Sequence, residues 1–231
     1  MRPLFFTTFA FLGLTSLACA EPLSQNDIKD LLARIRQIRS AAPSVQADFQ
    51  EEKTIRLLNK PIASSGTVWF QAPNKFRREI KGNSPSLTVS NGRELWIYYP
   101  NFKSAEHYSL GKRSPVDAAI ATINTALNLE NVENTFSISG AKIDSPSHGS
   151  GVAGNHYELE LSPRPASMKR LFEKFKLRLN PELLAERTEM LAPNGERVIT
   201  TYSNQKRAAT PLSTFEFTPP AGTEITTPLG R

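Results

Sequence analysis

The first periodic segment of the chain has the spacing of an amphipathic helix. Its apolar positions recur three and four residues apart, which places them along one helix face. A capping-box pattern at Ser24 and Asp27 precedes these positions, and Pro43 follows them. We therefore predict a helix that begins after Ser24, ends before Pro43 and packs on a sheet. Its apolar face comprises Ile28, Leu31, Leu32, Ile35 and Ile38.

After Pro43 the apolar period changes to two residues, the period of β-strands. Residues 45–110 alternate in this way, and we predict an antiparallel meander of about six strands there, with a tight hairpin turn at Asn91-Gly92. Ser114 and Pro115 then open a second predicted helix. Alternation resumes over residues 136–217, with a second hairpin turn at residues 193–196, which brings the total to about ten or eleven strands.

Alternating strands give a sheet one apolar face and one polar face. Two helices are too few to cover both faces, but they suffice for one. We therefore predict an α+β fold in which a single, strongly curved antiparallel sheet has its apolar concave face lidded by the helices. A covered apolar concavity is also a place where hydrophobic cargo can bind. No linker or internal repeat is visible in residues 21–231, so we expect them to form a single domain.

Residues 1–20 have the pattern of a cleaved secretory signal peptide. Arg2 precedes an apolar run over residues 4–17, and Ala18-Cys19-Ala20 supplies small residues at both positions of the cleavage motif. The apolar run is shorter than a membrane-spanning helix. We therefore expect export and cleavage after Ala20. Cleavage before Cys19 would instead leave its thiol for lipidation and tether the protein.

The composition excludes several classes of protein and of binding site. The chain has 231 residues, of which 39% are hydrophobic and 22% charged, and this balance excludes intrinsic disorder. One cysteine and three histidines exclude a disulfide framework and a thiolate metal site, and we expect no cofactor. The net charge of +6 is dispersed among acidic residues, so we expect no nucleic-acid partner.

Enzyme motifs are weak in this chain. The glycines of residues 149–154 spell a dinucleotide-binding pattern, but they precede a predicted strand and do not open a helix. His156 and Glu158 lie on one side of that strand, where we expect an exposed pair rather than a catalytic dyad. These observations favour a binding or carrier protein over an enzyme. A hydrolase that uses His156 is the least favoured alternative.

Three segments carry motifs in a fixed order along the chain. Residues 66–77 form a strand that ends in Pro73-Asn74, with Phe76 two positions on. Residues 87–100 place Leu-Trp-Ile-Tyr shortly after Asn91-Gly92, and residues 215–222 read Phe-Glu-Phe-Thr-Pro-Pro-Ala-Gly. In this order the motifs resemble those of the LolA family of periplasmic lipoprotein carriers, and the match runs from Phe49 to Gly222.

The resemblance implies an incomplete antiparallel β-barrel of about eleven strands with helices as a lid. It also implies a monomeric periplasmic shuttle that is not an enzyme. Such a carrier takes acylated lipoproteins from an inner-membrane ABC transporter of the Lol type, shields their acyl chains and passes them to an outer-membrane receptor. Two alternatives stay open: a carrier or sensor of another amphiphile, such as a glycolipid or fatty acid, and a tethered LolB-like receptor if Cys19 is lipidated.

One position departs from the family pattern. Carriers commonly place an arginine before the Pro-Asn turn, where it reaches backbone carbonyls of the lid helices, and this chain has Ala72 there. Alanine has no side-chain donor, so we expect a lid without that latch. The resemblance and the apolar faces together indicate a candidate acyl-chain cavity. Its predicted lining is Ile35, Ile38, Phe49, Trp69, Phe76, Leu87, Val89, Leu95, Ile97, Ile120 and Ile123.

Overall fold

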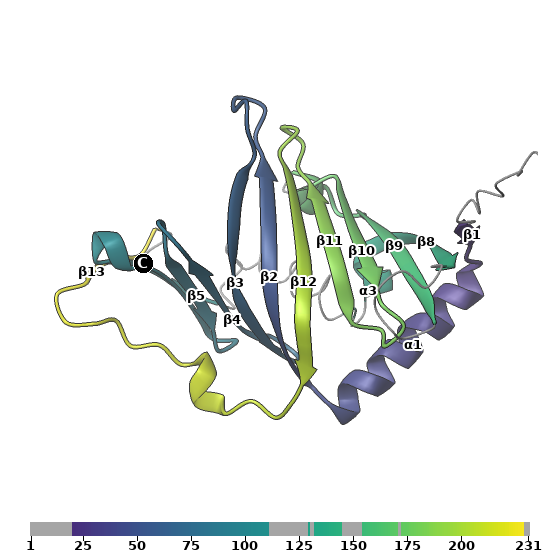
Figure 1. The fold of residues 1–231 in the computed structure, drawn as a ribbon, viewed down its shortest axis with the longest axis horizontal. Helices are drawn as coiled ribbons and strands as arrows, with labels where there is room; N and C mark the ends of the chain where they lie inside the picture. Colours follow the sequence, from purple (N-terminus) through teal and green to yellow (C-terminus); the bar gives the residue numbers. More distant parts are fainter. Residues whose placement is uncertain (1–19, 111–128, 130–131, 145–153, 171, 229–231) are drawn as a thin grey trace, which may run out of the picture.

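Among the residues that the structure describes, thirteen strands form one continuous sheet in the computed structural model (Figure 1). The described residues are 20–110, 129, 132–144, 154–170 and 172–228. The described helical segments are α1 (Gln25–Ala41), α3 (Val132–Thr135), α4 (Ala166–Lys169) and the 3-10 turns η1 (Pro100–Phe102) and η2 (Leu212–Phe215). The strands are β1 (Ala20–Pro22), β2 (Ser44–Thr54), β3 (Ile62–Gln71), β4 (Lys75–Lys81), β5 (Ser86–Ser90), β6 (Glu94–Tyr99), β7 (Ser104–Ser109), β8 (Phe136–Asp144), β9 (Asn155–Pro163), β10 (Lys174–Leu179), β11 (Ala185–Leu191), β12 (Arg197–Arg207) and β13 (Glu224–Thr226).

The sheet is open and consists of two meanders, β2 to β7 and β8 to β12, with a short strand at each edge. Its strand order is β1-β8-β9-β10-β11-β12-β2-β3-β4-β5-β6-β7-β13. The pairing of β12 with β2 joins the later strands to the earlier ones, and β13 and β7 form the one parallel pair described. The predicted curved antiparallel sheet is confirmed. The count exceeds the predicted eleven because three-residue strands, β1 and β13, form its two edges.

Both predicted hairpins are confirmed. Asn91 and Gly92 join β5 to β6, and the Asn91 side-chain oxygen accepts hydrogen bonds from the backbone N–H groups of Arg93 and Glu94, at 2.9 and 3.0 Å. Gly92 has φ +89° and Gly195, in the turn between β11 and β12, has φ +79°. Glycine reaches this left-handed region without a steric penalty, so both turns hold their hairpins in register.

Helix α1 is confirmed with the predicted boundaries and cap. The Ser24 hydroxyl accepts a hydrogen bond from the Asp27 N–H at 3.2 Å, and the Asp27 carboxylate accepts one from the Ser24 N–H at 2.9 Å. These hydrogen bonds lower the pKa of Asp27 below its usual value. The second predicted helix, which begins at Ser114-Pro115, lies outside the described residues, as do residues 1–19 of the predicted signal peptide.

Helix α1 packs on one face of the sheet, which we call the inner face; the opposite one is the outer face. Four apolar residues of α1 are buried against strands β8, β9 and β10, and Ile35 retains 1% of its surface exposure. Phe136 and Phe172 stack within this cluster, with ring centroids 5.9 Å apart. The hydrophobic core therefore lies at the α1 end of the sheet. Its largest members include Ile28, Leu32, Ile35, Phe136, Leu159, Leu161, Leu177 and Leu179.

The segment after β12 covers the outer face of β4 to β7. It crosses beneath these strands in Figure 1 (yellow). The Thr214 carbonyl accepts a hydrogen bond from Arg77, and the Phe217 ring lies 6.0 Å from that of Trp96. Phe215 is 1% exposed and Val89 is also 1% exposed. The outer face of this half of the sheet is thus closed by the chain itself.

Candidate functional site

A cavity of about 420 Å³ opens on the inner face, beside the α1 core. Residues directly opposite each other on paired strands share a face, and the register places the cavity wall on the same face as the buried leucines of β9 and β10. The wall is drawn from alternate positions of β2 to β6 and β10 to β12. Its lining residues are Phe49, Glu51, Val68, Phe70, Phe76, Arg78, Thr88, Leu95, Ile97, Phe175, Thr188, Met190, Val198, Thr200 and Tyr202.

The cavity wall is mostly apolar, but a band of polar groups crosses it. Arg78 and Glu51 form an ion pair with Nη2 and Oε2 2.8 Å apart, and the Thr200 hydroxyl donates a hydrogen bond to the same carboxylate at 3.1 Å. The Arg78 guanidinium also lies over the ring of Phe49, 4.4 Å from its centroid. The charges are therefore paired in place, and the cavity offers apolar surface on either side of them.

Tyr202 completes this band. Its hydroxyl lies 3.5 Å from that of Thr188, and burial raises its pKa above the usual value, so the phenol is neutral at physiological pH. Tyr202 is directly opposite Phe49 in the pairing of β12 with β2. The two aromatic rings thus stand at the seam where the two halves of the sheet join.

Four predicted lining residues lie on the cavity wall: Phe49, Phe76, Leu95 and Ile97. Trp69, Leu87 and Val89 do not. Trp69 lies between Val68 and Phe70, which line the cavity, and successive strand residues point to opposite faces. Leu87 and Val89 flank the lining residue Thr88 in the same way. The register therefore places these three side chains on the outer face.

The two predicted lining residues on α1 do not line the cavity either. Ile35 is buried in the α1 core, and Ile38 packs against that core. Both residues therefore belong to or border a filled core, where the prediction placed acyl chains. Ile120 and Ile123 lie outside the described residues, and their role stays a prediction.

The prediction also missed part of the wall. Phe175, Met190 and Val198 line the cavity from β10, β11 and β12. These strands do alternate apolar and polar residues. Only the pairing of β12 with β2, however, brings the three residues onto the same cavity wall as Phe49. Val68 and Phe70, on the two sides of Trp69 in β3, were missed as well.

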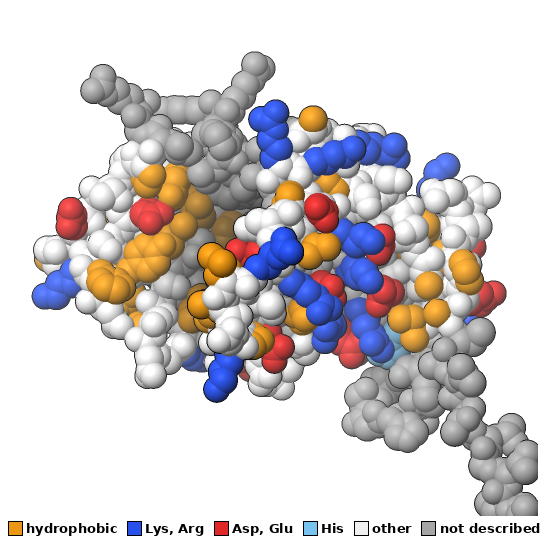
Figure 2. All heavy atoms as spheres, turned by 90° about the horizontal axis from the view of Figure 1, so that it is seen from above, with side chains coloured by type: hydrophobic (Ala, Val, Ile, Leu, Met, Phe, Trp, Pro, Cys, Tyr) orange, Lys and Arg blue, Asp and Glu red, His pale blue; other side chains and the backbone are white. Residues whose placement is uncertain are grey.

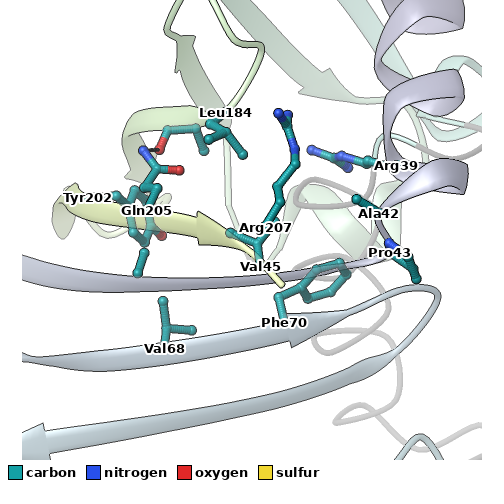
Figure 3. Close-up of a pocket in the computed structure, with 12 residues that line it drawn as sticks. Arg39, Ala42, Pro43, Val45, Val68, Phe70, Leu184, Tyr202, Gln205 and Arg207 are labelled. Atoms are coloured by element: carbon teal, nitrogen blue, oxygen red, sulfur yellow. Dashed lines mark hydrogen bonds between the residues drawn. The ribbon is translucent and has the colours of Figure 1, made fainter. Parts of the chain in front are cut away.

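A second, smaller pocket of about 90 Å³ continues from the cavity toward the end of α1 (Figure 3). It shares Val68, Phe70 and Tyr202 with the larger cavity. Arg39 of α1 and Arg207 of β12 both line it. Ala42 and Pro43 form its wall at the helix end, and the Ala72 N–H donates a hydrogen bond to the Pro43 carbonyl at 3.0 Å. The position without the family arginine therefore lies close to two other arginines.

Outside the two pockets, positive and negative side chains are largely interspersed with one another. In Figure 2, hydrophobic side chains gather on the side of the molecule where β4 to β7 lie, whereas Lys and Arg alternate with Asp and Glu over β9 to β12. The ion pairs of this region include Lys174 with Glu160 at 2.8 Å and Arg197 with Glu189 at 2.7 Å. Paired charges of this kind form a solvated strand face.

His156 differs from the expected exposed pair with Glu158. It is 8% exposed, and its Nδ1 lies 3.1 Å from the Glu186 carboxylate, which also contacts Arg178 at 3.3 Å. His156 is thus part of a structural polar contact between strands. Within the described part of the chain, no group of three or more His, Cys, Asp or Glu side chains is placed to hold a metal ion. No described helix is both long and apolar enough to cross a membrane.

The open curved sheet holds a cavity with a mostly apolar wall, and such a wall suits a hydrophobic ligand. The comparisons with known proteins identify the family. A family model described as "Outer membrane lipoprotein carrier protein LolA" matches residues 40–218, and the chain belongs to this family.

Similar proteins support this family assignment over nearly the full length. The chain is 28% identical over 222 residues to an outer-membrane lipoprotein carrier protein of Dechloromonas aromatica, with 95% of this chain and 93% of that protein covered. A protein of Chromobacterium violaceum with the same description is 25% identical, with 97% and 98% covered. Among solved structures, an uncharacterized conserved protein from Thermus thermophilus shares the fold, with TM-score 0.52, 14% identity and coverage of 87% and 98%.

Proposed function

We propose that this protein is a periplasmic carrier that shields the acyl chains of lipoproteins and moves them from the inner to the outer membrane. The observation that carries this proposal is the cavity of about 420 Å³, which lies beside a separate, filled core. A fold that needed only stability would fill this space, because an unfilled cavity costs stability. The family membership supports lipoproteins as the cargo.

The wall suits a ligand that must later be released. Each methylene transferred from water to an apolar site gains about 0.8 kcal/mol, so two or three acyl chains in a perfectly apolar cavity would hardly dissociate. The band of Glu51, Arg78 and Thr200 interrupts the apolar wall. An acyl chain that passes over this band gains less binding free energy. The cavity is thus suited to reversible binding.

The proposal includes two handover steps. An inner-membrane ABC transporter of the Lol type would load the cavity, and an outer-membrane receptor would empty it. The predicted signal peptide supports the periplasm as the place of work. A chain cleaved after Ala20 would act as a free monomer, whereas lipidation of Cys19 would make it a tethered receptor. The intact mass of the mature protein separates these two forms.

A release assay tests the carrier function. Purified protein is added to spheroplasts that make a triacylated lipoprotein, and the soluble fraction is assayed for a complex of the two. We expect a complex with the natural chain and at least a tenfold smaller yield with Ile97→Glu, which puts a charge on the cavity wall. Ile62→Glu is the matched control, because Ile62 is 48% exposed on β3.

The outcome of this assay decides between cargo classes. No release by the natural chain, beside a working carrier as positive control, would contradict lipoprotein transport. Equal loss in both variants would show that the charge acts through general destabilisation and not at the cavity. A carrier of another amphiphile is the second candidate, favoured by Ala72 and by the polar band within the cavity.

A further inference from the structure

Two arginines from distant parts of the sequence meet at the smaller pocket. Arg39 extends from the last turn of α1, and Arg207 is the last residue of β12. Both line the pocket, and Figure 3 shows the Arg39 side chain extending toward that of Arg207. An anion placed at this end of the pocket could accept hydrogen bonds from both guanidinium groups.

The surroundings of Arg207 leave part of its guanidinium without compensation. Its Nη2 donates a hydrogen bond to the Glu182 carbonyl at 2.8 Å, while its Nε is buried and has no hydrogen-bond partner among the described residues. Burial lowers its pKa, although the more distant charge of Glu182 acts in the opposite direction. Glu182 itself is exposed, and the described residues that line the pocket include no Asp or Glu.

Apolar surface leads from the arginines to the main cavity. Beside them the pocket wall is formed by Val45, Leu184 and Ala185, and then by the three residues shared with the cavity, Val68, Phe70 and Tyr202. A ligand that fits this path is charged at one end and apolar along its length. Guanidinium groups bind phosphate and carboxylate oxygens with paired hydrogen bonds, which makes these two groups the natural partners of the charged end.

We propose that Arg39 and Arg207 bind the anionic head group of a lipid whose acyl chain lies in the main cavity. This inference rests on the proposed lipid-carrying function and adds a class of cargo to it. An acyl chain attached through an ester or an amide brings no charge to this position. The arginine pair would therefore distinguish an anionic lipid, with a phosphate or carboxylate head, from a neutral one of equal chain length.

Binding of three single-chain probes below their micelle concentrations tests the proposal. The probes are oleoyl lysophosphatidate, oleate and mono-oleoylglycerol, and inorganic phosphate is the head group without a chain. Affinity is measured by calorimetry on the purified natural chain. We expect at least one anionic probe to bind tenfold or more tightly than mono-oleoylglycerol, and we expect this preference to fall with added salt.

A pair of double variants locates the effect. Arg39→Gln with Arg207→Gln should abolish the preference for the anionic probes and leave the affinity for mono-oleoylglycerol within twofold. Arg34→Gln with Lys206→Gln removes the same charge from exposed positions of α1 and β12 and should keep the preference. Circular dichroism confirms that both double variants are folded.

The possible results separate the two proposals. Equal binding of charged and neutral probes would overturn the arginine site and leave the lipid cavity standing. Inorganic phosphate that binds as tightly as lysophosphatidate would show a simple anion site and would also overturn the proposal. A preference that survives in Arg39→Gln with Arg207→Gln would place the anion elsewhere. Failure of all three chain-bearing probes to bind would contradict the lipid cavity itself.

Discussion

The inner face of the sheet has two halves that the same ladder of strands builds in different ways. Over β8 to β10, Leu159, Leu161 and Leu179 are fully buried beneath α1. Over β12 and β2 to β6, the same face carries aromatic residues together with Arg78 and Glu51, and it surrounds a cavity. Leucines with a packed helix make a core, whereas aromatic side chains with a polar band leave space for a ligand.

This comparison shows that apolar periodicity alone does not separate a core from a binding site. Both halves alternate with a period of two, and both point apolar residues to the same face. The difference lies in residue type and in what covers the face. Close packing that stabilises the first half would remove the second half's capacity to bind.

The largest expected effect is a difference in stability between substitutions in the two halves. Leu159→Ala should lower the free energy of unfolding by about 2–5 kcal/mol, because it leaves a void in a filled core. Phe76→Ala should cost only about 1 kcal/mol, because one side of its ring already faces the cavity. Urea unfolding followed by circular dichroism measures both. Equal losses would mean that the two halves are packed alike.

The ion pair in the cavity gives an intermediate effect. Arg78→Met leaves the Glu51 carboxylate half-buried without its partner, which should cost about 1–2 kcal/mol of stability. Adding Glu51→Met should restore most of that loss and slow the release of bound lipid, because the wall becomes continuous apolar surface. Urea unfolding and the rate of lipid dissociation test the two parts. A double variant less stable than Arg78→Met would refute this account.

An ion pair on the outer face should have the smallest effect. The hydrogen bond from Arg197 lowers the pKa of Glu189, so this pair adds stability above the carboxyl's usual pKa and loses it as the pH falls through the lowered value. Because solvent screens the pair, Glu189→Gln should cost about 0.5 kcal/mol at pH 7, and it should cost less at a pH below the lowered pKa of Glu189. Unfolding at the two pH values measures this. A larger loss at the lower pH would have the wrong sign.

The sequence was sufficient for the elements whose signals are local. The capping box at Ser24, the stop at Pro43 and the turn at Asn91-Gly92 all act within a few residues, and each was confirmed. The curved sheet followed from alternation and from the family resemblance. The assignment of faces was harder, because it depends on segments far apart in the chain.

Val89 and Trp69 illustrate why part of the site was not predictable. Val89 is buried as completely as a core residue, but the burial occurs on the outer face, where the segment after β12 lies. No local sequence pattern indicates that a C-terminal segment will cover these strands. The meeting of Arg39 with Arg207 likewise depends on where α1 ends relative to β12, which only the folded chain shows.

The short strands at the two ends of the sheet have a consequence for solubility. An open sheet keeps unpaired backbone donors and acceptors along its outermost strands, and long, flat edges of this kind recruit other chains into fibrils. Here β1 and β13 are three residues each, and the last pairing switches to parallel. Each of these edge strands therefore offers a foreign strand only a few hydrogen bonds. Short edge strands thus let a barrel stay unclosed with less risk that its edges seed aggregation.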